Sequence, residues 1–488
     1  MFSKEIFKQS IKANWKLWLI ITIVGSGILS GFVISYDATG YASIAAAAKG
    51  TAFSNFLSSM TSLLGSLENF YKLIAVILGI VYVVFTANAL VVSEVDSGSM
   101  AYTLSTPIKR SSVIFTKTLF LILSIIAMYS IISFSGLLAS QSQYQNVTGY
   151  AITDDIKEAA KTLNQDERYL SKRLYLIQDD KQALREAAAA RDMDSEAYSI
   201  YLASVINDRS YEEAAKIITD NRDDLYADDM DDDEIEITAQ ELMQDPAMIL
   251  NSNDALSAGA LIQGMSSNEY RQYVLDEIAA LEENNNLANN EVSQDSKVTI
   301  TKDNSKLLLE TVVDTSAKTL NISSDQVNEN LSLAKDSKAL KAASSTTNLK
   351  EEQIINLINQ TMISSARSED TALDFDLEAY MWLSLGLLSL ILAMSAIAFF
   401  ASTLFNTTNL ALTFGGGLPF AFFLITMIQQ LMDDSSIALE YLTITTLFDT
   451  DAILANNEFG YGLLALVTIA LILYTASNII FTKKDLPL

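Results

Sequence analysis

Apolar and polar stretches alternate along this chain, and six apolar stretches are long enough to cross a lipid bilayer as helices. A helix needs roughly 20 apolar residues to cross a hydrocarbon core of about 30 Å. Charged residues fall only near the ends of the six stretches, which is typical of membrane spans and unusual for buried helices of soluble proteins. The predicted spans are residues 15–36, 71–93, 113–139, 379–405, 410–431 and 461–481.

A long polar segment, residues 140–378, separates the third predicted span from the fourth. It holds 47 acidic and 21 basic residues, so almost all of the chain's net charge of −27 lies there. Capping-box patterns at Ser210 and Ser266, each with a glutamate three residues on, predict helices in its first part. The acidic run 223–236 lacks the ligand order of a calcium-binding loop, so we interpret it as a solvated loop.

The second part of this polar segment is predicted to follow a hinge at residues 284–290. Residues 297–301 and 335–344 are interpreted as short strands, around helices that begin near Ser323 and Asn348. The sequence therefore predicts an all-α polytopic membrane protein with six transmembrane helices and a mainly helical, or α+β, polar domain. The expected domains are residues 1–139, 140–378 and 379–488.

The distribution of lysine and arginine predicts the orientation of the spans. Cations gather before the first span, around the connection from the second span to the third, and after the sixth, whereas the loop 432–460 has carboxylates and no cation. Because positive residues favour the cytoplasmic side, we expect a multi-pass protein of the cell membrane with cytoplasmic termini and an extracellular segment 140–378. The cations are Lys4, Lys8, Lys12, Lys16, Lys109, Arg110, Lys117, Lys483 and Lys484.

Composition excludes several classes of function. The chain has no cysteine and no histidine, which removes disulfides, thiolate metal sites and imidazole chemistry. It has no basic cluster of the kind that binds nucleic acid. A proton-coupled transporter requires ionisable residues near the middle of its spans, and none of the predicted spans has one. The phosphate-binding pattern G-x-x-x-x-G-K-[ST] is also missing, so we expect no enzyme activity, metal or cofactor on this chain.

A few polar or helix-breaking residues inside the predicted spans are candidates for a substrate path. Their alternative roles are hydrogen bonds between helices and, for the glycine cluster, a bend or close packing of the fifth span. The candidates are Thr86, Asn88, Gly415, Gly416, Gly417, Pro419, Gln429 and Gln430.

The connection between the second and third spans has the features of a docking element. A short helix is predicted over residues 99–105, and Pro107 ends it because the residue before proline avoids the α region. The carboxylates Glu94 and Asp96 precede this helix, and the cations Lys109 and Arg110 follow it.

This connection resembles that of the membrane subunits of type-2 ABC exporters. The family pattern has a glutamate, a glycine a few residues on, then Leu-Leu-Ser-x-Pro-x-x-Arg and a lysine seven residues later. The chain supplies Glu94, Gly98, Leu104, Ser105, Pro107, Arg110 and Lys117 at these spacings. A second, weaker similarity places residues 441–449 in the family's segment that dips into the outer leaflet. With the six-span layout, the resemblance covers residues 1–139 and 379–488, and the segment 140–378 departs from it.

The resemblance implies the permease subunit of an ATP-driven ABC transporter that exports a peptide, lipid, drug or envelope component. Its implied partners are a dimer of cytoplasmic ABC ATPase subunits, which hold ATP and Mg²⁺, and a second copy or a homologous permease in the bilayer. The coupling loop 94–112 would then seat in the ATPase. The alternative is a membrane sensor or scaffold whose extracellular domain binds a ligand or an envelope partner.

Overall fold

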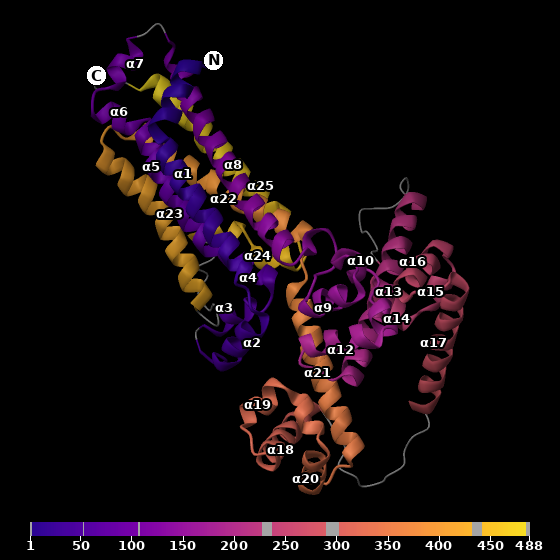
Figure 1. Ribbon diagram of the computed structural model, residues 1–488. Helices are drawn as coiled ribbons and strands as arrows, with labels where there is room; N and C mark the ends of the chain where they lie inside the picture. The colour runs from indigo at the N-terminus through magenta and orange to yellow at the C-terminus, as the bar shows by residue number, and fades with distance from the viewer. Residues whose placement is uncertain are drawn as a thin grey trace. The chain divides into compact units, whose positions relative to one another are not determined.

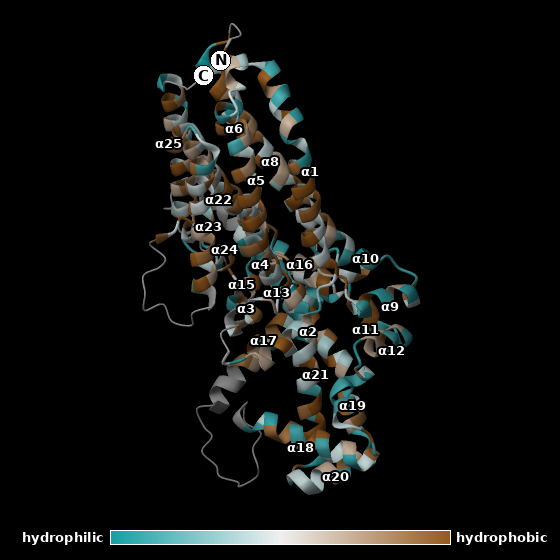
Figure 2. Ribbon diagram, turned by 90° about the vertical axis from the view of Figure 1, so that its left-hand side faces the viewer, coloured by the Kyte–Doolittle hydropathy of each residue, from teal (hydrophilic) through white to brown (hydrophobic). Residues whose placement is uncertain are grey.

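The computed structural model describes residues 2–51, 53–105, 108–226, 237–288, 302–431 and 442–484. The chain divides into two compact units, which we call the membrane unit, Met1–Gly149 with Thr371–Leu488, and the inserted unit, Tyr150–Asp370. The division falls somewhat inside the expected boundaries at 140 and 378. Figure 2 shows that hydrophobic residues dominate the long helices of the membrane unit, whereas the helices of the inserted unit are mixed.

Among the described residues, the membrane unit contains six helices that are long and apolar enough to cross a bilayer, as predicted. The first, third, fourth, fifth and sixth are single helices. The second is a continuous run of α4 (Leu63–Asn69), the π-helix η1 (Phe70–Ala75), α5 (Val76–Leu90) and α6 (Val92–Asp96). The single helices are α1 (Lys4–Ile34), α8 (Arg110–Gln143), α22 (Leu377–Leu404), α23 (Thr408–Leu431) and α25 (Gly460–Lys483).

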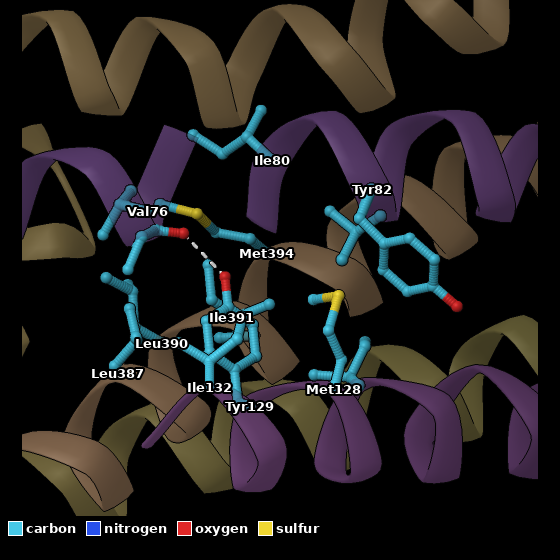
Figure 3. Close-up of a cluster of buried hydrophobic side chains, with 14 of the residues drawn as sticks. Val76, Ile80, Tyr82, Met128, Tyr129, Ile132, Leu387, Leu390, Ile391 and Met394 are labelled. Carbon is cyan, nitrogen blue, oxygen red and sulfur yellow. Dashed lines mark hydrogen bonds between the residues drawn. The ribbon is translucent and has the colours of Figure 1, made fainter. Parts of the chain in front are cut away.

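The core of the membrane unit lies between α5, α8 and α22. Side chains of these helices interdigitate there, and the Tyr129 hydroxyl donates to the carbonyl of Ala75 at 2.6 Å (Figure 3). The windows of the second and fourth spans are 67% and 61% buried, against 22–33% for the other four. The second and fourth spans are therefore central, and the outer faces of the others are left for lipid. The labelled core residues are Val76, Ile80, Tyr82, Met128, Tyr129, Ile132, Leu387, Leu390, Ile391 and Met394.

Short helices connect the spans. Between the first and second spans lie α2 (Ala38–Ala47) and α3 (Ser54–Ser59), and α7 (Met100–Leu104) lies between the second and third. Before the sixth span lie the 3₁₀ turn η5 (Thr445–Leu447) and α24 (Thr450–Leu454). The chain ends, α6 and α7 lie at one end of the bundle, and α2 and α3 lie at the other (Figure 1).

The inserted unit has two hydrophobic cores that share the long helix α13 (Ser195–Tyr226). One core joins the first half of α13 to the helices at both ends of the unit, and the other joins its second half to the middle helices. The first group comprises α9 (Asp154–Leu163), α10 (Glu167–Ser171), α11 (Tyr175–Asp179), α12 (Lys181–Ala190), α18 (Lys302–Leu320), α19 (Ser324–Glu329), η3 (Leu331–Lys335), α20 (Ser337–Thr347) and α21 (Glu351–Leu373). The second comprises α14 (Ala239–Gln244), α15 (Ala247–Leu250), α16 (Asn253–Gln263) and α17 (Ser267–Ala288).

The described residues contain no strand, and the strand predicted over residues 335–344 is wrong. Lys335 ends η3, and the Asp336 carboxylate accepts from the amide of Lys338 at 2.8 Å, which caps α20. The alanine-rich sequence that follows has high helix propensity. The other predicted strand, 297–301, lies outside the described residues. Of the acidic run 223–236, which was predicted to be a loop, residues 223–226 are helical because α13 continues to Tyr226, and residues 227–236 lie outside the described residues.

Other local predictions have mixed outcomes. The capping box at Ser266 is confirmed, because its hydroxyl accepts from the Glu269 amide and the Glu269 carboxylate accepts from the Ser266 amide. The box at Ser210 is wrong: Ser210 lies inside α13 and donates to the carbonyl of Asn207. The described part of the predicted hinge, residues 284–288, is helical. A helix begins after Ser323 as expected, with a complete capping box.

Both ends of the inserted unit are held by polar contacts. In the membrane unit, the Asn146 side chain donates to the carbonyl of Leu373 at 2.7 Å, which joins the outgoing and the returning chain. In the inserted unit, the buried Arg191 guanidinium lies 3.1 Å from Asp155 near the start and 2.7 Å from Asp370 at the end. On both sides of the boundary between the units, a polar contact therefore joins the chain that enters the inserted unit to the chain that leaves it.

Candidate functional site

The candidate coupling element is the pair of short helices α6 and α7, which lie with both chain ends at one end of the membrane unit (Figure 1). Glu94 of α6 forms an ion pair with Lys117 of α8, with 2.7 Å between the carboxylate oxygen and Nζ. Lys117 is 2% exposed and also donates to the carbonyl of Leu90, the last residue of α5. A carbonyl at a helix end has no partner within the helix, so one buried cation satisfies both this carbonyl and Glu94.

Two further contacts fix α6 to the fourth and fifth spans. The backbone amide of Val92 donates to the Ser402 hydroxyl of α22 at 3.0 Å, and Ser402 donates in turn to the carbonyl of Ala87. The Asp96 carboxylate accepts from the amide of Thr408 at 3.1 Å. Asp96 thus places a negative charge at the start of α23, where the helix dipole favours it. Spans three, four and five all hold α6.

Helix α7 follows α6 after a turn at Gly98. Gly98 has a φ of +73° with no atom within 4 Å of a Cβ placed there, so backbone conformation rather than space favours glycine. Met100 is fully buried, whereas Tyr102 is 81% exposed. Leu104 packs against the core, and the exposed Ser105 donates to the carbonyl of Tyr102. Pro107 lies outside the described residues. The helix therefore packs the apolar side chains of Met100 and Leu104 inside and presents the large aromatic side chain of Tyr102 outside.

The cations after α7 lie at the surface beside the end of the sixth span. Lys109 and Arg110 are exposed, and Arg110 donates to the carbonyl of Lys484 at 3.2 Å. The Lys484 ammonium donates to the carbonyls of Thr403 and Leu404 at the end of α22. Sequence reasoning assigned Lys484 to orientation alone, although a lysine can also satisfy the carbonyls at a helix C-terminus. Ser402 and Thr408 carried no signal in the sequence.

A polar cavity of about 290 Å³ lies at the opposite end of the membrane unit. Its lining combines hydroxyl, amide and charged side chains with a few apolar ones, contributed by the second, fourth and fifth spans and by the segment before the sixth. The lining residues are Lys72, Val76, Leu390, Phe423, Thr426, Gln429, Thr445, Thr446, Phe448, Asp449, Thr450 and Asp451.

Lys72 belongs to the second span and links it to the segment before the sixth span. Its ammonium lies 3.5 Å from Glu68 and 3.5 Å from Asp451, and the Thr450 hydroxyl donates to Glu68 at 2.6 Å. Lys72 belongs to the π-helix η1, a form that is often found at functional sites. The sequence showed Lys72 only as a charge near the end of a span, because its partner Asp451 is distant along the chain.

The other predicted path residues do not gather at this cavity. Thr86 and Asn88 are buried in α5, where Asn88 donates to the carbonyl of Val84 in its own helix. A Cβ at Gly415 would lie 3.0 Å from Ala401 and 3.1 Å from Ala398, and one at Gly416 would lie 3.0 Å from Val84.

These two glycines therefore mark close packing of α23 against α22 and α5. Gly417 faces open space and Pro419 lies inside α23. Gln429 lines the cavity, and the side chain of Gln430 lies outside the described part.

The described part of the inserted unit has a buried charge cluster around Arg191. Arg191 faces Asp155 and Asp370, whose carboxylates also accept from the hydroxyls of Tyr198 and Tyr201. Each charged group has a partner, which is typical of a structural cluster. The described residues contain no group of acidic side chains that could hold a metal ion.

Residues 2–156 match the family model described as ABC-2 family transporter protein. The matched range contains the first three spans and the coupling element. The match supports a relation of this part of the chain to ABC-2 type permeases, which are membrane subunits of transporters. Comparison with curated proteins and with solved structures gave no match.

Proposed function

We propose that this chain is the permease subunit of an ATP-driven exporter that docks a dimer of cytoplasmic ATPase subunits through α7. The carrying observation is the contrast between α6 and α7. Contacts to three spans fix α6, whereas α7 presents the 81% exposed Tyr102, and the exposed cations Lys109 and Arg110 follow α7 in the chain. A force on α7 would therefore pass through α6 to spans three, four and five.

In this proposal the ends of the membrane unit have different roles. The end with both termini faces the cytoplasm, and the inserted unit is extracellular, as the distribution of cations favours. The cavity lined by Gln429 and Lys72 is then the outer part of the substrate path. Its hydroxyl, amide and charged groups fit a polar part of a peptide, lipid, drug or envelope component. A second copy or a homologous permease completes the transporter.

The test is co-purification with the ATPase subunit. We expect Tyr102→Ser to reduce the amount of ATPase recovered with the detergent-solubilised permease, because an exposed aromatic side chain is a typical interface anchor. The matched control is Tyr461→Ser: Tyr461 is 79% exposed but begins the sixth span at the opposite end of the unit. Equal ATPase recovery with both variants would contradict docking through α7.

The inserted unit favours one alternative, a sensor or scaffold that binds a ligand or an envelope partner. It has two cores of its own, far more structure than a connection between spans needs. Both readings allow an associated ATPase. ATP-dependent substrate flux into vesicles supports the exporter, whereas ligand binding that changes ATP hydrolysis without any flux supports the sensor.

A further inference from the structure

The connection between the first and second spans contains an apolar helix that the described part of the membrane unit covers only in part: Ala38 and Tyr41 pack against the core, and most of its other residues are exposed. Helix α2 (Ala38–Ala47) has no charged residue and no buried residue. Ile44 is 51% exposed, and Phe53, which follows in the connection to α3, is 55% exposed. The hydroxyls of Thr39 and Ser43 are bonded locally, to the Asp37 carboxylate and to the carbonyl of Gly40, so α2 has no charged face to turn toward water. A mainly apolar helix of this kind is normally buried in protein or in a membrane, and helices of this length are marginal in water by themselves.

The position of α2 places it at the surface of the bilayer. The first span ends at Ile34 and α2 begins at Ala38. The hydroxyl of Tyr36 donates to the carbonyl of Thr61 at 2.7 Å, directly before the second span begins at Leu63. Both ends of the connection are thereby fixed where the first two spans leave the membrane. Ten residues extend about 15 Å at 1.5 Å per residue, which is half the hydrocarbon thickness, so α2 cannot cross it.

Charge and aromatic residues also fit a lipid surface. Lys49 is the only charged residue of the sequence between 38 and 62, whereas the segment 140–378 is strongly acidic. Asp37, directly before α2, caps the helix by accepting from the amide of Gly40 at 3.1 Å. Tyr36 stacks on Tyr41 at a centroid distance of 5.7 Å. Tyrosine is enriched at the boundary between membrane and water, and an exposed lysine there can face lipid phosphates.

We infer that α2 lies in the interface of the leaflet at the end of the membrane unit opposite the termini, with lipid as its covering partner. It contacts lipid next to the end of the first span, where Ile34, the last residue of α1, is also exposed. The inference rests on the six-span fold and does not depend on the proposed transport function.

The natural absence of cysteine allows a clean test by spin labelling. Single variants Ile44→Cys and Ala46→Cys of the full chain carry a nitroxide in nanodiscs of phosphatidylcholine with phosphatidylglycerol. Accessibility to oxygen, which concentrates in lipid, is compared with accessibility to a water-soluble nickel chelate. Two matched controls are Ile23→Cys within the first span, 62% exposed, and Leu307→Cys in the inserted unit, 67% exposed.

We expect the ratio of oxygen to nickel accessibility at Ile44 and Ala46 to lie well above that at Leu307 and to approach that at Ile23. A ratio equal to that at Leu307 would place α2 in water and overturn the inference. Low accessibility to both reagents would mean that protein covers α2, which also overturns it. In that case, the labelled chain is diluted with unlabelled chain. If a second copy covers α2, the spin–spin broadening disappears on dilution; if the chain's own inserted unit covers it, the spectrum does not change.

Discussion

Lys117 shows how a cation is kept near the end of a membrane-spanning helix. Its ammonium has two partners, the Glu94 carboxylate and the carbonyl of Leu90. Spacing and resemblance picked out both charged residues, but they could not predict that the two would pair, because pairing depends on how α8 packs against the end of α5. Glu94 is therefore turned toward its own chain, and any effect of Glu94 on ATPase docking would act through the position of α6.

Removing the cation alone should destabilise the membrane unit. Lys117→Met keeps the length of the side chain but leaves Glu94 and the Leu90 carbonyl without their donor. We expect a loss of about 2–3 kcal/mol, less than the 3–5 kcal/mol of a fully buried pair because Glu94 is partly exposed. Chemical unfolding in detergent measures it. The double variant with Glu94→Gln should lose less than the two single variants added together, and simple additivity would show that the pair is not coupled.

Asp194 in the inserted unit gives a pH dependence with a definite sign. Burial works to raise its pKa, but the Lys335 ammonium and the amides of Ala197 and Glu196 outweigh burial and hold the pKa below its usual range. A lowered pKa in the folded state adds stability above the unfolded pKa of about 3.9, and this stability is lost as the pH falls through the folded pKa.

We therefore expect the first turn of α13 to lose protection from hydrogen exchange below about pH 4, after correction for the intrinsic rate. Asp194→Asn should show weaker protection at neutral pH and a flatter pH profile. Asp179→Asn, at an exposed site, serves as the control and should behave like the parent chain. An unchanged profile in Asp194→Asn would rule out this linkage.

Among the elements, those with a strong local signal were predictable from sequence. The spans follow from long uncharged runs, and the capping box at Ser266 follows from residues three apart. The box pattern at Ser210 failed because a serine followed by glutamate also occurs inside helices, and the core shared along α13 keeps the helix continuous there. At residues 335–344 the helix signal was present in Asp336 and the alanines after it.

The glycine cluster of α23 gives an element-level prediction. Gly415→Val should push α23 away from α22, because its Cβ would meet backbone atoms of Ala398 at 3.1 Å. We expect destabilisation of about 1–3 kcal/mol, as for other overpacked sites. Gly417→Val is the matched control, since it has no atom within 4 Å of its Cβ. Thermal unfolding in detergent compares them, and equal melting temperatures would contradict close packing at Gly415.

For the whole molecule, composition predicted that the polar segment and the apolar rest would form separate units, because the polar segment is stable in water and the apolar rest in lipid. Contacts between distant parts of the chain were not predictable. Asp96 with Thr408, Val92 with Ser402, and Lys72 with Asp451 are each separated by more than 300 residues. Without side-chain geometry, the sequence offered no reason to join them.

The orientation of the whole chain can be tested with single cysteines. With both termini cytoplasmic, a membrane-impermeant maleimide added to intact cells should label Gln178→Cys in the inserted unit. It should label Ser105→Cys at the end of α7 only after permeabilisation. Both positions are exposed, so accessibility within the fold does not bias the comparison. Labelling of Ser105→Cys in intact cells would reverse the assigned topology.

The hydrogen bond from Asn146 to the carbonyl of Leu373 has a consequence for how such a chain could arise. It brings the outgoing and returning chain together on the membrane side of the boundary, so the six-span bundle does not need the inserted unit to bring spans three and four together. An ancestor with a short turn at this place could have received a whole folded cassette without a change to its bundle. The same junction is a natural place to exchange that cassette for another in an engineered chain.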